Sequence, residues 1–150
     1  MAFSTLASSQ ALAGAIVIDN SVMMRWLFND GSKADQQYAQ RTRAHIGTKQ
    51  LQVIVPYIWI YEASFVTNFY TKKGLISIAD AVSHLNALFD LCLVIRGEEM
   101  PSELFQFANT HGLSTYDAAY VMLALQQGCA IATLDKAIIK TSNAAGYNVF

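Results

Sequence analysis

Four acidic residues of this 150-residue sequence could act together as ligands of a metal ion: Asp19, Glu62, Asp117 and Asp135. Asp19 directly follows the apolar run 16–18, and Asp135 follows the run 131–134. Both runs are typical of buried strands, so we expect each carboxylate to leave the carboxyl end of a strand, where open α/β sheets bind their ligands. If the two strands are neighbours, both acids face one crevice.

The other two acids lie in segments with helical periodicity. Glu62 has apolar residues at positions −4, +3, +4 and +7 relative to it, which places its carboxylate in mid-helix on the inward face. These neighbours are Ile58, Phe65, Val66 and Phe69. Asp117 falls in the first turn of another such segment, again on its apolar face. An inward carboxylate needs a partner, because burying an unpaired charge is costly.

Helix capping is the competing explanation for three of these acids. Asp19 and Asp135 could each cap the helix that follows, and the segment 114–117, Ser-Thr-Tyr-Asp, matches a capping box. For any one of the three, capping and metal binding explain the residue equally well. Glu62, expected in mid-helix, has no capping role. The coincidence of all four favours a shared site.

Convergence of the four carboxylates would determine the chemistry. Two unit charges about 4 Å apart repel by roughly 4 kcal/mol at an effective dielectric constant of 20, so protons or cations must bind there. Oxygen ligands without Cys or His favour Mg²⁺ or Mn²⁺ over zinc. Such ions lower the pKa of an attacking water and stabilise a leaving oxygen, which predicts phosphodiester hydrolysis.

Other side chains near these acids have supporting roles or structural ones. Ser21 and Thr133 could hydrogen-bond the metal-bound carboxylates, although for Ser21 we favour helix capping. Arg25 and Lys136 lie within one or two turns of the acids and could contact the phosphates of a nucleic-acid substrate. The aromatic residues in these helices are expected to pack in the core or a dimer interface rather than stack on bases. They are Trp26, Trp59, Phe65 and Phe69.

The elements that must position these residues alternate between strands and helices. Strands are expected at 15–18, 51–54, 91–95, 130–133 and 147–150. Helices are expected at 21–28, 33–46, 56–71, 78–89, 101–110, 115–126 and 135–142. This alternation predicts a three-layer α/β sandwich, with a central parallel sheet of about five strands and helices on both faces. Pro56 and Pro101 are expected in first helical turns, and glycines 74, 112, 128 and 146 just after helices.

Composition indicates one domain, residues 15–150, after a partly ordered N-terminal extension, residues 1–14. No apolar run approaches the roughly 20 residues of a membrane helix, so we expect a soluble protein. Cys92 and Cys129 lie in apolar runs without metal or disulfide spacing, which favours reduced thiols and the cytoplasm. The net charge is −1, but setting aside four of the eleven acids as ligands leaves seven acids against ten bases, a balance of +3. Charge therefore neither favours nor excludes a nucleic-acid substrate.

The motifs resemble those of PIN-domain nucleases, in particular the toxins of VapBC-type toxin–antitoxin modules. The matching stretches, in family order, are 17–22 (VIDNSV), 61–63 (YEA), 113–120 (LSTYDAAY) and 131–135 (IATLD). The resemblance implies a parallel sheet, an acidic pocket at Asp19, Glu62, Asp117 and Asp135, and an endoribonuclease dependent on Mg²⁺ or Mn²⁺. It also implies dimerisation and an antitoxin protein that blocks the active-site groove. A second acid beside Asp135, present in some relatives, is missing, which leaves open whether one or two ions bind.

Three other functions remain open at this point. A phosphatase with an aspartyl nucleophile would have Asp-x-Asp after the first strand, whereas this sequence has Asp19-Asn20-Ser21. In a non-catalytic binding module, the acids would cap helices and exposed helices would contact a partner. DNA is the alternative substrate, because nothing in the sequence indicates a contact to a 2′-hydroxyl.

Overall fold

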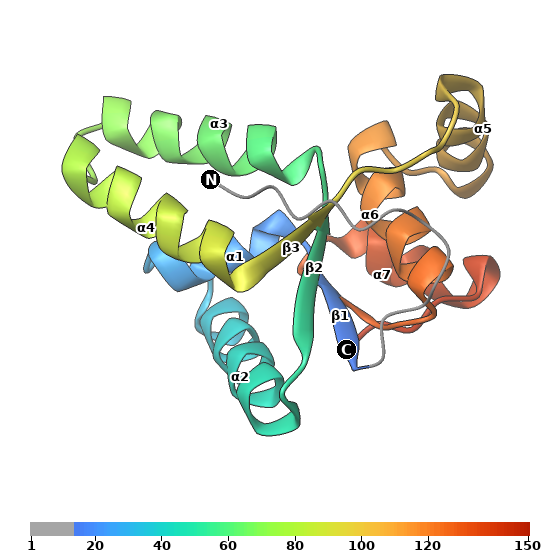
Figure 1. Ribbon diagram of the computed structural model, residues 1–150, viewed down its shortest axis with the longest axis horizontal. Coiled ribbons are helices and arrows are strands. Elements are labelled where there is room, and N and C mark those ends of the chain that lie inside the picture. Colours follow the sequence, from blue (N-terminus) through green and yellow to red (C-terminus); the bar gives the residue numbers. More distant parts are fainter. Residues whose placement is uncertain (1–13) are drawn as a thin grey trace.

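The computed structural model describes residues 14–150, which form a parallel sheet with helices on both faces (Figure 1). The expected extension, residues 1–14, lies outside the described residues except for Gly14. The strands are β1 (Ala15–Ile18), β2 (Gln52–Pro56), β3 (Cys92–Ile95) and β4 (Ile131–Ala132). The helices are α1 (Asn20–Leu27), α2 (Lys33–Lys49), α3 (Trp59–Lys72), α4 (Ile78–Leu91), α5 (Pro101–His111), α6 (Thr115–Gln127) and α7 (Lys136–Ala145). The α/β prediction is confirmed.

The sheet has the strand order β3-β2-β1-β4, and all of its pairings are parallel. Within the described residues it has four strands rather than about five. The segment expected as a fifth strand, 147–150, makes one parallel bridge, between Ile131 and Val149. Its sheet pairing among the described residues is limited to Ile131, because β4 ends at Ala132 and the chain then turns into α7.

The helices form two layers. The chain moves from β1 to β2 to β3 through two helical crossovers and then returns past β1 to β4. Because parallel crossovers are right-handed, this reversal places α1–α4 on one face and α5–α7 on the other. Figure 1 shows the two groups on opposite sides of the strands. The reversal occurs between β1 and β4, the position at which such sheets bind ligands.

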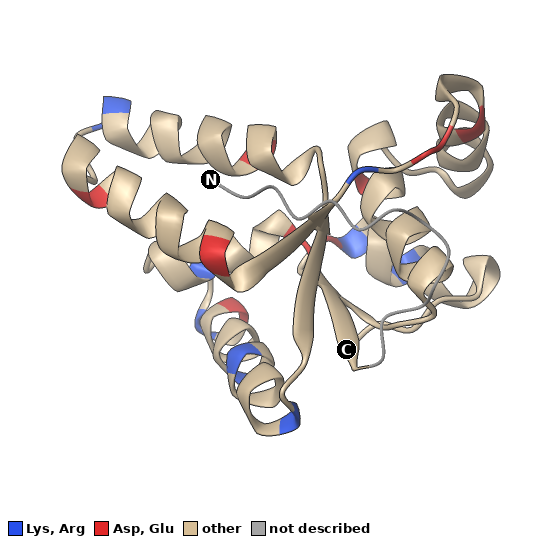
Figure 2. Ribbon diagram, viewed as in Figure 1, with Lys and Arg blue, Asp and Glu red and all other residues tan. Residues whose placement is uncertain are grey.

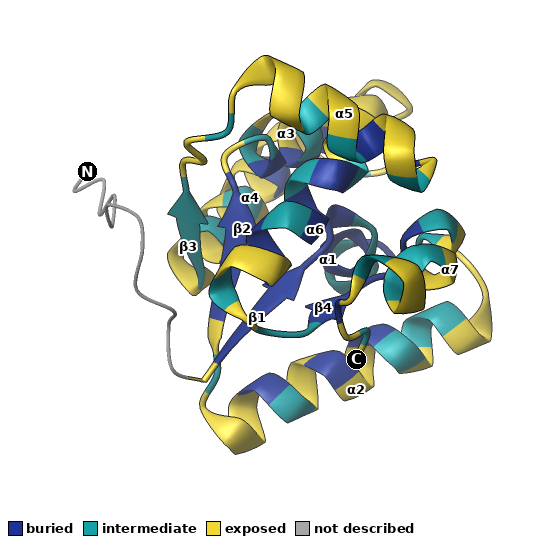
Figure 3. Cartoon of the chain, turned by 90° about the vertical axis from the view of Figure 1, so that its right-hand side faces the viewer, coloured by how far each residue is buried: buried dark blue, intermediate teal, exposed yellow. Residues whose placement is uncertain are grey.

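The core is centred on β1 and β2. Val17, Ile18, Ile54 and Val55 are fully buried, because helices cover both faces of these strands (Figure 3). The run of β-branched residues is what a strand without a solvent face requires. β3, at the edge of the sheet, is only half-buried. Among the described residues, no helix combines the length and apolarity needed to cross a membrane.

Two prolines define different boundaries. Pro101 is in the first turn of α5, as expected, where its missing N–H costs nothing. Pro56 was expected in a first helical turn, but it is the last residue of β2, where it pairs with Ile95. As a result α3 begins only at Trp59. Glycines were expected just after four helices, and the structure has them there with positive φ. They are Gly74 after α3, Gly112 after α5, Gly128 after α6 and Gly146 after α7.

Candidate active site

Asp19 and Asp135 lie at the same edge of the sheet. β1 and β4 are neighbours, with Ile18 paired to Ala132. The backbone N–H of Asp19 donates to the carbonyl of Ala132 at 2.9 Å, which extends the pairing by one residue. The two acids therefore leave adjacent strands at the point where both chains turn into helices.

The carboxylate of Asp19 is buried and held by two hydroxyl groups. Its Oδ2 accepts hydrogen bonds from Ser21 Oγ at 2.6 Å and Thr133 Oγ1 at 2.8 Å. Burial raises the pKa of Asp19, the two hydroxyls oppose that rise, and the negative charges of Asp117 and Asp135 add to it. Asp19 occupies the N-cap position of α1 but makes no side-chain cap bond. Capping does not explain this residue.

Ser21 and Thr133 each connect Asp19 to the turn between β4 and α7. Thr133 Oγ1 accepts the backbone N–H of Asp135 at 2.9 Å, and Ser21 Oγ accepts that of Leu134 at 3.1 Å. The expected capping role of Ser21 is therefore wrong. Its hydroxyl instead bridges the end of β1 and the turn after β4. Each hydroxyl donates its one proton to Asp19 while its oxygen accepts from the turn.

Glu62 differs from expectation in its place on α3. Because α3 begins at Trp59, Glu62 is in the first turn rather than in mid-helix. The prediction that Glu62 shares a buried apolar face with Phe65 and Phe69 is also wrong, since these two side chains are 74% and 49% exposed. The buried side of α3 consists of Trp59, Ala63 and Thr67. Core packing is thus excluded for Phe65 and Phe69.

The Glu62 carboxylate is half-buried and has a tyrosine partner. Its Oε2 accepts a hydrogen bond from the Tyr120 hydroxyl at 2.5 Å. Burial raises the pKa of Glu62 to about 7; the Tyr120 hydroxyl opposes this, and the charges of Asp19 and Asp117 add to it. The protonated and the ionised forms of Glu62 are therefore both populated in the neutral pH range.

Asp117 and Asp135 each form hydrogen bonds with residues close in the sequence, and each is also a candidate ligand of the cation. Ser114 Oγ donates to Asp117 Oδ2 at 2.7 Å and accepts the Asp117 N–H at 3.0 Å. Burial raises the pKa of Asp117, and the charge of Asp135 adds to this. Asp135 caps α7, with its Oδ1 accepting from the N–H groups of Ala137 and Ile138 at 2.8 and 3.1 Å. Capping and a site role are compatible, because the cap uses only one of the two oxygens.

The electrostatic influence of these acids on one another shows that they occupy one region. Asp19 is affected by Asp117 and Asp135, and Glu62 by Asp19 and Asp117. Within residues 14–150, however, no three His, Cys, Asp or Glu side chains form a ready-made metal site. The hydrogen bonds explain this, since each carboxylate is directed to its own hydroxyl or amide donors. A donor set made only of carboxylates, in which neighbouring negative charges raise the pKa values of Asp19, Glu62 and Asp117, fits a hard divalent cation.

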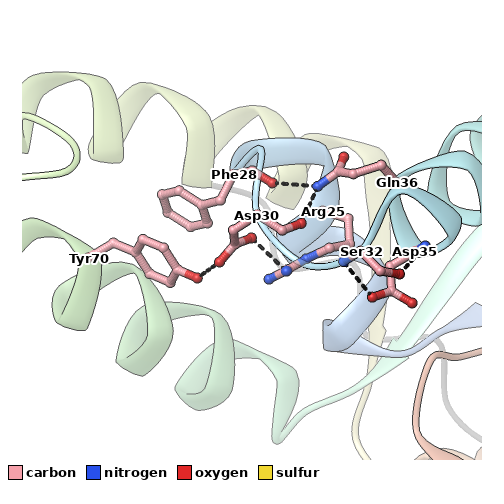
Figure 4. A network of polar contacts seen from close by, with 7 residues as sticks. All are labelled: Arg25, Phe28, Asp30, Ser32, Asp35, Gln36 and Tyr70. Atoms are coloured by element: carbon pink, nitrogen blue, oxygen red, sulfur yellow. Dashed lines mark hydrogen bonds and ion pairs between the residues drawn. The ribbon is translucent and has the colours of Figure 1, made fainter.

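Arg25 is already engaged by a neighbouring acid. Its Nη1 lies 2.6 Å from Asp30 Oδ1, and the Tyr70 hydroxyl donates to the other Asp30 oxygen (Figure 4). A Cβ atom at Gly31 would approach Arg25 Nη1 to 2.8 Å, so this loop packs closely on the guanidinium. Lys136 is exposed beside Asp135. Of the two basic residues expected near the acids, Lys136 is the more available for phosphate.

Tyr38 and Tyr120 also belong to this region. The Tyr38 hydroxyl accepts the Thr133 N–H at 3.2 Å and donates to the Phe150 carbonyl at 2.9 Å. Nothing in the sequence indicates this role for Tyr38. Tyr120 could have been found, because it lies three residues after Asp117 and therefore on the same helix face.

Residues 16–144 of the sequence match the PIN domain family. The chain belongs to the PIN domain family. PIN domain proteins are nucleases that generally use divalent metal ions. The acidic edge of the sheet lies within the matched residues, and its carboxylates suit such an ion. No curated protein sequence matches this chain.

Solved structures agree with the PIN fold. The chain is similar to PAE2754 from Pyrobaculum aerophilum, with a TM-score of 0.66, 20% identity, and 94% of this chain and 88% of that chain covered. It is also similar to FitAcB from Neisseria gonorrhoeae, with a TM-score of 0.57, 16% identity, and 90% of this chain and 96% of that chain covered. At these identities the likeness shows the fold.

Proposed function

We propose that this PIN domain is an endoribonuclease dependent on Mg²⁺ or Mn²⁺, with its active site at the four acids. One observation supports the proposal: the charges of these carboxylates act on one another, and the pKa values of Asp19, Glu62 and Asp117 are raised. The four are Asp19, Glu62, Asp117 and Asp135. Repulsion among them is what a bound cation would relieve.

The protein groups would divide the work as follows. Asp19, Glu62, Asp117 and Asp135 would hold the cation, which would activate water and stabilise charge on the phosphate. Ser21 and Thr133 keep Asp19 Oδ2 engaged and so fix the orientation of that carboxylate. Lys136, exposed next to Asp135, would contact a substrate phosphate. Arg25 could contact a phosphate only if its ion pair with Asp30 were broken, so its proposed role is the weaker one.

A nucleic-acid substrate is supported by the distribution of charge. Four basic residues on α2 are exposed, against one acid in that helix (Figure 2). They are Lys33, Arg41, Arg43 and Lys49. A helix with a basic outer face attracts phosphates of either nucleic acid. The preference for RNA over DNA rests on the sequence resemblance, and DNA is the alternative substrate.

The same resemblance supports a toxin of a VapBC-type module, acting in the cytoplasm and blocked by an antitoxin protein that covers the acidic groove. A homodimer is part of this proposal. It is supported by a row of exposed aromatic residues at four-residue intervals before and along α3. They are Tyr57, Tyr61, Phe65 and Phe69.

A catalytically silent protein-binding module is the second candidate. It is favoured by the fact that Asp135 caps α7 and Asp117 bonds Ser114, so both acids have structural partners. It predicts no effect of Mg²⁺ or Mn²⁺ on the melting temperature, whereas a ligand of the folded state raises it.

The test is cleavage of a mixed tRNA and ribosomal-RNA pool by the purified protein, with Mg²⁺ or Mn²⁺ against EDTA. Wild type should give discrete fragments that require metal, and Asp117→Asn should give none. Asp80→Asn is the matched control, because Ser77 bonds Asp80 in the first turn of α4 just as Ser114 bonds Asp117. Silence of wild type and both variants, with melting curves unchanged by Mn²⁺, would support the binding module.

A further inference from the structure

Tyr120 has a hydroxyl group that is buried at the centre of the acidic region. The residue is 0% exposed and lies on α6, which packs against β1 and β2. A buried tyrosine hydroxyl normally finds hydrogen-bond partners, since leaving it unpaired is costly. Its partners therefore indicate what the hydroxyl does.

The Tyr120 oxygen lies between a donor and an acceptor. The backbone N–H of Asn20 hydrogen-bonds this oxygen, and the hydroxyl donates to Glu62 Oε2 at 2.5 Å. Asn20 is the first residue of α1, so its N–H has no acceptor within the helix. With that N–H directed at the oxygen, the one phenolic proton is left for Glu62.

We propose that Tyr120 is a positioning residue that orients the Glu62 carboxylate for cation binding. The hydroxyl makes Oε2 an acceptor and leaves Oε1 free to face the cation. This inference rests on the metal site of the proposed function, but not on RNA as its substrate.

The placement of Tyr120 connects the elements that carry three of the four acids. Asp117 lies three residues earlier on α6, on the same helix face. Asn20 directly follows Asp19, and Glu62 belongs to α3. A single hydroxyl thus joins α6, the start of α1 and the start of α3. Displacement of one of these elements would change the spacing of the carboxylates.

Tyr120→Phe keeps the ring and removes only the hydroxyl. Titration calorimetry with Mn²⁺ should show an affinity about tenfold weaker than wild type, the low end of the range for groups that orient metal ligands. Tyr70→Phe is the matched control, because the Tyr70 hydroxyl donates to Asp30, a carboxylate outside the site (Figure 4). Its Mn²⁺ affinity should equal that of wild type.

A double-mutant cycle separates orientation of Glu62 from a general structural role. In a Glu62→Gln background, Tyr120→Phe should cause no further loss of Mn²⁺ affinity. Equal losses in both backgrounds, or an unchanged affinity of Tyr120→Phe, would overturn the inference.

Glu62→Asp provides a test that leaves the core intact. It keeps the charge but shortens the side chain by one methylene, so the carboxylate cannot reach the Tyr120 hydroxyl. We expect the same weakening of Mn²⁺ binding as in Tyr120→Phe, and wild-type affinity would overturn the inference. Absence of Mn²⁺ binding by wild type would refute the metal site and this role together. Normal Mn²⁺ binding without RNA cleavage would refute only the proposal that RNA is the substrate, and would leave the role of Tyr120 intact.

Discussion

Thr133 Oγ1 donates a hydrogen bond to Asp19 Oδ2 at 2.8 Å across 114 positions of the sequence. The contact exists because β1 and β4 are adjacent parallel strands that end at the same edge. Together with Ser21, Thr133 satisfies one oxygen of a buried carboxylate whose pKa burial raises. The other oxygen, Oδ1, is left for the cation of the proposed function.

Thr133→Val should lower both stability and activity. The change keeps the shape of the side chain but deprives Asp19 of a donor and the Asp135 N–H of an acceptor. Leaving such buried groups unpaired costs about 1–3 kcal/mol of unfolding free energy, measured by urea denaturation. Thr67→Val is the control, because Thr67 is also buried and its hydroxyl has no partner among residues 14–150. A loss in Thr67→Val as large as that in Thr133→Val would contradict the prediction.

Mn²⁺ affinity should rise with pH between about 6 and 8. The pKa of Glu62 is raised to about 7, so protons compete with the cation below that pH. Titration calorimetry across this range should show the rise in wild type. In Glu62→Gln the remaining pH dependence should be much smaller. A wild-type affinity that is flat from pH 6 to 8 would exclude Glu62 as a ligand.

The unfolding free energy of the metal-free protein should fall as the pH rises from 5 to 8. The pKa of folded Glu62, about 7, is above the usual 4.5, so its contribution to folding is full below pH 4.5 and is lost as the pH rises through 7. Urea denaturation in EDTA should therefore show a smaller decline between pH 5 and 8 for Glu62→Gln than for wild type. Parallel pH profiles would contradict the raised pKa.

Asp135→Ser should separate capping from catalysis. Serine is as good an N-cap residue as aspartate, so the melting temperature should change by only a few degrees. Cleavage of RNA should nevertheless be lost, because the carboxylate is gone. Asp135→Ala should lose the cap and the activity together, with a further fall of about 1 kcal/mol in unfolding free energy. If Asp135→Ser retains full activity, Asp135 is a cap alone.

Phe65→Asp should convert a dimer into a monomer. Phe65 is 74% exposed in the row of aromatic side chains along α3, and a charge there would be buried in an apolar interface. Light scattering after gel filtration should give half the wild-type mass. Phe105→Asp, at a 62% exposed position of α5, is the control and should keep the dimer. Identical masses for wild type and Phe65→Asp would place the interface elsewhere or exclude a dimer.

Sequence patterns predicted most of the fold, because periodicity and helix boundaries are local properties. All seven expected helices are present, and Pro101 begins α5. Pro56 was misassigned because a proline fits a strand end as well as a first helical turn, and only pairing with Ile95 distinguishes the two. That shift moved Glu62 from mid-helix into the first turn of α3. The fifth strand became a single bridge because β4 is only two residues long.

The sequence by itself determined the α/β class, the family motifs and the identity of the candidate acids, since these depend on residue types and spacings along the chain. Tertiary structure alone decided which distant donors Asp19 and Glu62 receive. Asp19 obtains Thr133, and Glu62 obtains Tyr120 from 58 positions away. It also decided that Phe65 faces solvent and that Arg25 is paired with Asp30. Hydrogen bonds and burial depend on which segments meet in space, and strand order and helix packing fix those meetings.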